Sequence, residues 1–323
     1  MYQLTCRARE KGRGLISVTP AGGSPDPAAA GLERWVVLVH GFNNSWKAAS
    51  ATWRVTVEEL KVWHVDLGAV VLFYWPGDYS RWQVRSAMNY PRTVPIAEET
   101  AKLLARYLQR TAQDWRRPLQ LSFVAHSLGS LVVLETIRLL RSTKANVSID
   151  DVLFMAAAVP EGFCLPGEAY GNSFSLETKE AALYSLDDGV LKRFFQVGQQ
   201  IAQRFPESRR RAVGRSGGPG AGIGQRWATA VHMDSFGHSD YWSGRSLLST
   251  LPVLFRNPDE DPFPRSITAK FQSNLTPYVV TRSRPIRSVR MTILARKLCQ
   301  AGSRGRLMCR RVELRRDRCE SGF

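Results

Sequence analysis

The stretch LQLSFVAHSLGSLVVLETIRLLR, residues 119–141, decides the fold. It opens on a mostly apolar run, Leu119 to Val124. The apolar residues after it recur at the spacing of one helix face, at Leu128, Leu131, Val132, Leu134 and Leu139. The two patterns meet at Ala125-His126-Ser127-Leu128-Gly129. The stretch therefore predicts a buried strand, a sharp turn and an amphipathic helix.

Ser127 stands at the centre of this predicted turn. A serine between a strand and a helix adopts strained backbone angles, so the residues two before and two after it must be small. Ala125 and Gly129 are small, although the usual first residue of this pattern is glycine. The turn would lift the Ser127 hydroxyl above the carboxyl edge of the sheet, beside the positive end of the next helix. The alternative is a serine that only caps a helix.

Similar apolar runs alternate with helical segments along the chain. The other predicted strands are Arg34–Val39, Ala69–Trp75, Val152–Val159, Ala181–Leu186 and, most weakly, Trp227–Met233. The predicted helices are Lys47–Trp63, Pro95–Trp115, Ser127–Arg141 and Asp188–Phe205. Repeated strand–helix units predict an α/β fold with a doubly wound, mostly parallel sheet and helices on both faces.

Three regions surround or interrupt this pattern. Residues 1–30 hold two expected antiparallel edge strands, Gln3–Arg9 and Leu15–Thr19, and a linker to the main domain at 31–250. Glu207 to Gly224 is rich in Arg and Gly and predicts a mobile surface loop with almost nothing to bury. Residues 251–323 predict a basic, poorly ordered C-terminal extension.

The charge of the chain is concentrated in that extension. The net charge is +17, and residues 276–323 contain 13 Lys and Arg against 3 Asp and Glu, a net of +10. Few aromatic residues lie between the arginines, and no nucleic-acid module is recognisable. We therefore expect no specific nucleic-acid partner, and only weak contact between this tail and an anionic surface.

Targeting and metal signals are weak in this sequence. No apolar run approaches the roughly 18 residues that span a bilayer, and the first 14 residues mix Arg, Lys and Glu without an apolar core. The sequence thus predicts a cytoplasmic protein with no transmembrane segment. The five cysteines match no zinc or disulfide spacing, so no metal and no cofactor is expected.

A serine hydroxyl needs a base to become a nucleophile at neutral pH. The chain has five histidines. His238 lies in a loop just after the last predicted strand and is the preferred base. We expect His126 to point away from the serine and His232 to have a packed or hydrogen-bonded core role in the last strand. His40 and His64 lie earlier in the chain. The alternative for His238 is a position at a helix start, with Ser239 or Asp240 as the cap.

The base in turn needs a carboxylate that fixes its tautomer. Asp187 and Asp188 follow the strand Ala181–Leu186 and lie between the serine and the histidine, in the order that this kind of fold uses. Asp188 is preferred because it begins the next helix. Asp187 is the alternative acid, and either aspartate could serve only as a helix cap.

The loop His40-Gly41-Phe42-Asn43-Asn44-Ser45-Trp46 follows the first long strand. A glycine at a strand exit lets the backbone turn an amide toward a developing oxyanion. The backbone amides of Phe42 and Leu128 are therefore the predicted oxyanion hole.

Aromatic residues follow the strand Ala69–Trp75 at the edge where ligands bind in such sheets. Candidate walls of an acyl or aromatic pocket are Trp75, Tyr79, Trp82 and Tyr90. Ordinary packing of a surface segment is an equally good interpretation.

Together these motifs resemble the α/β-hydrolase superfamily, and within it a bacterial branch of uncharacterised esterases. The resemblance covers about residues 33–244 and rests on HGFNNS at 40–45, the Trp-Pro at 75–76, AHSLG at 125–129, the Asp-Asp turn and GHSDYW at 237–242. The resemblance implies serine-hydrolase chemistry without a metal, and it implies no particular substrate. Our hypothesis is that the protein cleaves a small-molecule ester or thioester through an acyl-enzyme. The Arg- and Gly-rich loop and the tail depart from the branch. The alternative function is a non-catalytic scaffold that binds a partner or an anionic surface through its tail.

Overall fold

A computed structural model describes residues 1–8, 14–62, 68–77, 83–113, 115–173, 178–195, 211–219 and 229–242 of the chain. All of them belong to one compact unit, Met1–Glu260. The predicted boundary near residue 250 and the predicted extension 251–323 lie outside the described residues.

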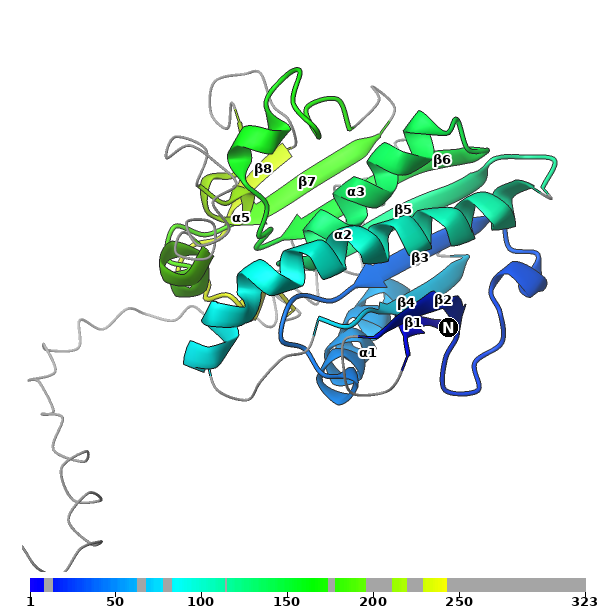
Figure 1. The fold of residues 1–323 in the computed structure, drawn as a ribbon, viewed down its shortest axis with the longest axis horizontal. Coiled ribbons are helices and arrows are strands. Elements are labelled where there is room, and N and C mark those ends of the chain that lie inside the picture. The colour runs from blue at the N-terminus through cyan, green and yellow to red at the C-terminus, as the bar shows by residue number, and fades with distance from the viewer. Residues whose placement is uncertain are drawn as a thin grey trace, which may run out of the picture. The chain divides into compact units, whose positions relative to one another are not determined.

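One eight-stranded sheet forms the centre of this unit, with the strand order β2-β1-β4-β3-β5-β6-β7-β8 (Figure 1). The strands are β1 (Tyr2–Arg7), β2 (Leu15–Pro20), β3 (Arg34–Val39), β4 (Ala69–Tyr74), β5 (Leu119–His126), β6 (Val147–Met155), β7 (Lys179–Tyr184) and β8 (Thr229–His232). Strand β2 runs antiparallel to β1, and the other neighbouring pairs are parallel. This confirms the predicted doubly wound, mostly parallel sheet.

The central strands are apolar because both of their faces are covered. Every residue of β4 is buried, and so is every residue of β3 after Arg34. Such strands appear in a sequence as continuous apolar runs, which is why the predicted bounds of β3 and β4 agree with the structure to within one residue. The predicted bounds of β6, Val152–Val159, are wrong: the strand begins five residues earlier and ends at Met155, because its first residues are partly polar and only half-buried. The two N-terminal strands differ from the prediction. Only β2 is an edge strand, because β1 pairs in parallel with β4 on its other side.

Helices cover both faces of the sheet. Helices α2 (Gln83–Gln113) and α3 (Gly129–Ser142) lie in front of the sheet in Figure 1, and α1 (Trp46–Val62) lies on the other face. The prediction of a helix starting at Pro95 is wrong, because α2 begins twelve residues earlier and contains both Pro91 and Pro95. Proline commonly marks a first helical turn, and here tertiary packing overrides that signal: Tyr90, one turn before Pro95, packs between Phe42 and Phe195.

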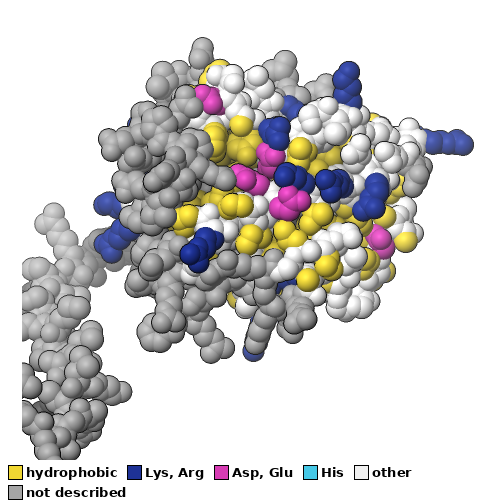
Figure 2. All heavy atoms as spheres, in the orientation of Figure 1, with side chains coloured by type: hydrophobic (Ala, Val, Ile, Leu, Met, Phe, Trp, Pro, Cys, Tyr) yellow, Lys and Arg dark blue, Asp and Glu magenta, His cyan; other side chains and the backbone are white. Residues whose placement is uncertain are grey.

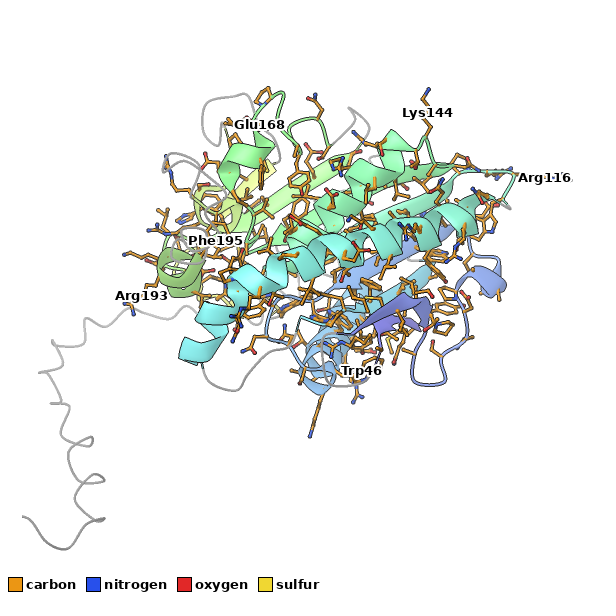
Figure 3. The ribbon with its side chains drawn as sticks, viewed as in Figure 1. Trp46, Arg116, Lys144, Glu168, Arg193 and Phe195 are labelled. Carbon is orange, nitrogen blue, oxygen red and sulfur yellow. The ribbon has the colours of Figure 1, made fainter. Side chains whose placement is uncertain are left out.

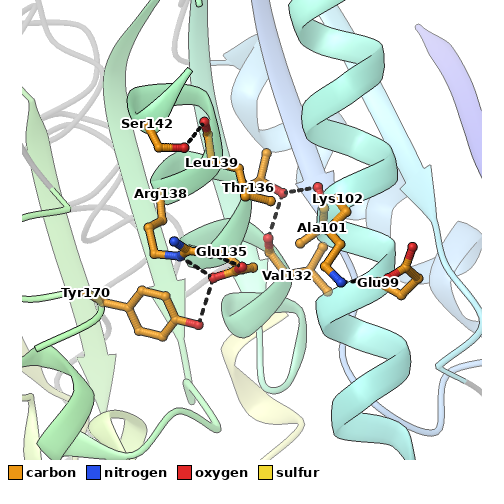
Figure 4. Close-up of polar contacts among 10 residues, drawn as sticks. All are labelled: Glu99, Ala101, Lys102, Val132, Glu135, Thr136, Arg138, Leu139, Ser142 and Tyr170. Atoms are coloured by element: carbon orange, nitrogen blue, oxygen red, sulfur yellow. Dashed lines mark hydrogen bonds and ion pairs between the residues drawn. The ribbon is translucent and has the colours of Figure 1, made fainter. Parts of the chain in front are cut away.

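Helices α2 and α3 pack closely because α2 presents small residues. Ala97, Ala101 and Ala105 are buried on one side of α2, and the Thr136 hydroxyl of α3 donates to Val132 O (2.7 Å) and contacts Ala101 O (3.4 Å), as Figure 4 shows. On α3, Glu135 accepts two hydrogen bonds from Arg138, at 2.7 and 2.6 Å, and a third from the Tyr170 hydroxyl at 3.3 Å. Helix α3, which begins directly after the turn at Ser127, is thus packed against α2.

The segment between β7 and β8 confirms one prediction and contradicts another. The described part of the predicted helix Asp188–Phe205 is helical: residues 189–190 are α-helical and lead into the π-helical turn η3 (Leu191–Phe195), whereas residues 196–205 lie outside the described residues. The expected mobile loop at 207–224 is wrong for residues 211–219. Val213 is fully buried in the short helix α5 (Val213–Ser216), and its N–H donates to Val159 O at 2.9 Å.

The face covered by α2 and α3 carries charges of both signs. Figure 2 shows Lys and Arg side chains mixed with Asp and Glu on this face, in contrast to the Arg-rich composition of residues 276–323. None of the helices among the described residues is both long enough and apolar enough to cross a bilayer.

Candidate active site

Ser127 occupies a sharp turn between β5 and α3. Its φ of 52° lies in the left-handed region, which costs a residue with a side chain about 1–3 kcal/mol. Two backbone hydrogen bonds hold this conformation: Ser127 N–H donates to Met155 O at 2.9 Å, and Ala158 N–H donates to Ser127 O at 3.1 Å. Both partners belong to β6 or the segment after it. The sheet therefore holds the serine in the strained turn expected from its sequence.

Two glycines let the end of β3 approach this turn. A Cβ on Gly129 would lie 2.4 Å from His40 O, and a Cβ on Gly41 would lie 2.8 Å from both Ser127 Cβ and His126 Nδ1. Real Cβ atoms essentially never come so close. The loop after β3 and the turn at Ser127 therefore fit together only because neither glycine has a side chain.

His238 approaches Ser127 from a loop 111 residues later in the chain. Its Nε2 lies 2.9 Å from Ser127 Oγ, and its side chain is 16% exposed. Within the loop, the Asp240 carboxylate accepts a hydrogen bond from Gly237 N–H at 2.7 Å. The 3-10 helix η5 (Asp240–Trp242) buries Tyr241, which packs edge-on against Phe236. A capping aspartate and two aromatic rings thus fix the backbone on either side of His238.

Asp188 completes a chain of three side chains. Its Oδ2 lies 2.8 Å from His238 Nδ1, and its Oδ1 accepts hydrogen bonds from Val190 N–H at 3.0 Å and Leu191 N–H at 2.9 Å. The carboxylate is fully buried. One aspartate thus holds the imidazole and also caps the next turn, roles that the sequence analysis had set against each other. The alternative acid, Asp187, is exposed and does not fill this position.

The backbone amides of Phe42 and Leu128 lie on the two segments that meet at this turn. Across the described residues, neither amide donates a hydrogen bond to another protein group. Leu128 immediately precedes α3, so its N–H lies at the positive end of that helix. Two such donors beside a serine hydroxyl are suited to binding a negatively charged oxygen.

His40 fixes the peptide that carries the Phe42 amide. Its Nδ1 lies 2.9 Å from Gly41 O, and its Nε2 accepts a hydrogen bond from Trp75 N–H at 3.3 Å. Because a trans peptide is planar, holding the Gly41 carbonyl also sets the opposite direction of the Phe42 N–H. Burial, with a smaller effect of the Arg7 charge, lowers the pKa of His40 to about 3. The ring therefore stays neutral and keeps both bonds.

A second buried histidine contacts the loop that carries the base. His126 Nε2 lies 2.7 Å from the backbone oxygen of His238, and the two imidazole rings are 5.0 Å apart. The sequence predicts only that His126 points away from the nucleophile, and it does not predict the contact between His126 and the backbone of His238. A histidine next to a turn gives no signal in the sequence of which distant loop it will meet.

The four predicted pocket residues have different outcomes. Trp75 is fully buried; its ring stacks on His40 and its Nε1 donates to His40 O at 2.8 Å. A ring with no exposed surface offers no wall to a ligand, so that interpretation of Trp75 is corrected. Tyr79 and Trp82 lie outside the described residues. The Tyr90 hydroxyl donates to Ala158 O at 3.2 Å.

The ring of Tyr90 links the predicted oxyanion loop to the turn after β7. It packs edge-on against Phe42, with ring centres 6.1 Å apart, and against Phe195, with ring centres 5.9 Å apart. Figure 3 shows Phe195 on the turn that lies beside the N-terminal half of α2. These three rings, from three separate elements, form an aromatic cluster next to the site.

The remaining histidines lie away from this chain of side chains. His232 is exposed, and its Nδ1 lies 3.2 Å from the Asp234 carboxylate. The expected core position of His232 is therefore wrong, because the last residue of the edge strand β8 faces solvent, although its ring lies 5.0 Å from the ring of Tyr184. His64 lies outside the described residues.

Comparison with known proteins shows to which family the chain belongs. Residues 31–192 match the model of a protein family described as alpha/beta hydrolase of unknown function (DUF900). The chain belongs to this family. The match contains β3, the turn at Ser127 and Asp188, and it ends before the loop that carries His238. No curated protein matches the sequence.

Several solved structures are similar to parts of the α/β hydrolase. One is a gene product from Listeria innocua, with 10% identity and a TM-score of 0.42 over 70% of this chain and 96% of that chain. A mature lipase from Bacillus licheniformis has 16% identity and a TM-score of 0.37, over 72% of this chain and 95% of that chain. A prodiginine-pathway thioesterase from Streptomyces coelicolor has 25% identity and a TM-score of 0.27, over 43% and 46% of the two chains.

Proposed function

We propose that this α/β hydrolase is a serine hydrolase that cleaves an ester or thioester bond through an acyl-enzyme. One observation carries the proposal. Ser127 Oγ lies 2.9 Å from His238 Nε2, and His238 Nδ1 lies 2.8 Å from the buried Asp188 carboxylate. A nucleophile bonded to a base that is itself held by a third group is the arrangement that activates a serine.

The first half of the reaction forms the acyl-enzyme. His238 Nε2 accepts the hydroxyl proton of Ser127 while Oγ attacks the carbonyl carbon of the substrate. Asp188 accepts a hydrogen bond from His238 Nδ1–H and stabilises the imidazolium that forms. When the tetrahedral intermediate collapses, the bond to the leaving oxygen or sulfur breaks, and the proton on Nε2 passes to the departing alcohol or thiol.

The amides of Phe42 and Leu128 act on the oxyanion of this intermediate. Each donor of this kind contributes about 3–4 kcal/mol to transition-state stabilisation. Two features support their role: both N–H groups lack a protein acceptor among the described residues, and His40 holds the peptide that carries the Phe42 amide. Neither donor requires a side chain, so the hole depends on backbone positions alone.

The second half of the reaction returns the free enzyme. His238 takes a proton from a water molecule, the resulting hydroxide attacks the acyl carbonyl, and the bond to Ser127 Oγ breaks as the serine recovers its proton. The products are a carboxylic acid and the alcohol or thiol released earlier. The substrate class that we propose is a small-molecule ester or thioester.

The test is hydrolysis of p-nitrophenyl acetate and butyrate by the full chain and by Ser127→Ala. We expect the variant to lose at least about 1,000-fold in kcat, since the covalent route depends on that oxygen. Ser130→Ala is the matched control, because Ser130 is a buried serine three residues away whose hydroxyl has no hydrogen-bond partner among the described residues. Equal rates for Ser127→Ala and wild type would disprove the proposal.

A non-catalytic scaffold is the second candidate. The complete arrangement of Ser127, His238 and Asp188 favours the enzyme, since a scaffold without activity need not retain all three. A fluorophosphonate probe distinguishes the two, because a scaffold would not react with it. Binding through residues 251–323 and the cytoplasmic location stay predictions from the sequence.

A further inference from the structure

The hydrogen bond between His126 and His238 joins the residue before the nucleophile to the backbone of the proposed base. We propose that His126 is a positioning residue: its Nε2–H holds the His238 carbonyl and so keeps the His238 imidazole aligned between Ser127 and Asp188. This inference rests on the proposed function for its kinetic consequences, and on the geometry of the histidine loop for its structural ones.

The partner of His126 decides which ring nitrogen carries the proton. A backbone carbonyl can only accept a hydrogen bond, so His126 Nε2, 2.7 Å from His238 O, must be the donor. Nδ1 is buried and has no hydrogen-bond partner in the described part of the protein. A second proton on Nδ1 would therefore place an unsolvated charge inside the protein. The contacts select one neutral tautomer.

His126 keeps this neutral tautomer at the pH at which His238 acts as a base. Burial, followed by repulsion from His238, lowers the pKa of His126 to about 3, and the hydrogen bond to His238 O and the charge of Asp188 oppose this effect only in part. His126 thus keeps a proton on Nε2 and none on Nδ1 while His238 gains and loses its proton during turnover. Two histidines 5.0 Å apart take different roles because one is buried and bonded to a carbonyl.

Among the described residues, the other backbone hydrogen bonds next to His238 are local to the loop, so the bond from His126 acts as an anchor. The bonds between Gly237 and Asp240 run within the loop, whereas the bond from His126 spans 112 residues and ties the loop to the end of β5. The rings of Tyr241 and Trp242 lie 6.4 and 5.7 Å from the His126 ring and close the space around it. Within the described residues, His126 thus links the turn of the nucleophile to the backbone of the proposed base by a hydrogen bond.

Loss of this link would change the rate without removing a reacting group. A displacement of about 1 Å at a catalytic group costs on the order of 100-fold in rate. The His126 ring lies beside Gly41 of the oxyanion loop, but its hydrogen bond goes to His238 O and not to the peptides of Phe42 or Leu128. Loss of the donor should therefore act on the base and change substrate binding little. The expected result of losing the donor is a fall in kcat with nearly constant KM.

The experiment compares His126→Leu with His126→Gln in the full chain. Leucine fills much of the same space without a donor, whereas the amide nitrogen of glutamine reaches close to the position of Nε2. We expect His126→Leu to lower kcat on p-nitrophenyl butyrate by about 10- to 100-fold with KM changed less than threefold, and His126→Gln to recover most of the loss. His232→Leu, at an exposed histidine, is the matched control and should resemble wild type.

Equal kcat values for His126→Leu and His126→Gln, both folded, would overturn the inference, because filling space would then be the whole role. If His126→Leu does not fold, His126→Asn replaces it: its amide ends near the position of Nδ1 and falls short of the carbonyl, and it should show the same loss of kcat.

A second measurement separates this inference from the proposed function. In proton NMR, the Nδ1–H of His238 bonded to Asp188 should give a far-downfield signal in wild type and His126→Gln, and the signal should broaden or vanish in His126→Leu. An unchanged signal in His126→Leu overturns the positioning role whatever the activity. If Ser127→Ala is as active as wild type while the signal behaves as expected, the proposed function fails and the positioning role stands.

Discussion

Replacing Asp188 by Asn tests the proposed triad with little change in shape. In the structure, Oδ1 of Asp188 caps the next turn by accepting from Val190 and Leu191 N–H, and Oδ2 faces His238 Nδ1. The asparagine oxygen can keep the two capping bonds, which places its NH₂ group where Oδ2 was. That group donates, so it selects the histidine tautomer with no proton on Nδ1. Nε2 then carries a proton and cannot accept one from Ser127.

The size of the effect follows from this reversal. The substitution leaves the nucleophile and the proposed oxyanion donors in place and removes the base function. Losing the correct tautomer in a serine triad costs about 10,000-fold in kcat, or roughly 5.5 kcal/mol in activation free energy. Asp187→Asn is the matched control, because Asp187 is the exposed neighbour, and its rate should stay within about twofold of wild type.

The assay is steady-state hydrolysis of p-nitrophenyl butyrate, together with a thermal melt of each variant. A melt that shows folded Asp188→Asn makes the kinetic result interpretable. Less than a tenfold loss in a folded Asp188→Asn variant, or an equal loss in Asp187→Asn, would refute the assignment of Asp188 as the acid.

Two further predictions concern stability. Gly129→Ala should lower the free energy of unfolding by at least about 2 kcal/mol, because the new Cβ would lie 2.4 Å from His40 O. Gly189→Ala is the control and should cost far less, since nothing lies within 4 Å of its Cβ position. Urea unfolding measures both, and similar losses would contradict the close approach at the turn. His40 and His126 both have folded-state pKa values lowered to about 3, so the unfolded chain binds their protons first as the pH falls below about 6.5, and the stability that they contribute above that pH is lost on acidification. Between pH 7 and pH 5 each histidine should account for about 2 kcal/mol of this loss, and an equal loss in His40→Gln and wild type would show that the ring does not stay neutral.

The sequence predicted the parts of this protein that depend on local pattern. Strands β3 and β4 are buried on both faces, so their apolar runs mark their bounds. The turn at Ser127 needs small neighbours, which Ala125 and Gly129 reveal without any knowledge of distant contacts. The order serine, aspartate, histidine along the chain reduced the acid to Asp187 or Asp188, and the structure places Asp188 and His238 in a chain with Ser127.

The features that the sequence could not predict depend on tertiary contacts. Helix α2 passes through two prolines because Tyr90 packs into an aromatic cluster. Residues 211–219 looked like a loop with nothing to bury, yet Val213 lies in the core through backbone bonds to the segment after β6. Trp75 was predicted to line a pocket because it ends a strand at the edge of the sheet where ligands bind. In the structure the Trp75 ring is buried, stacked on His40. In each case the residue contacts partners that are distant in the sequence.

The most direct measurement of the central claim is the site of covalent modification. The full chain is treated with a fluorophosphonate, and the adduct is mapped by peptide mass spectrometry in wild type and in His238→Gln. The account predicts one adduct, on Ser127, that forms at least about 100-fold more slowly without the histidine base. No adduct on Ser127, or equal labelling rates in wild type and His238→Gln, would contradict it.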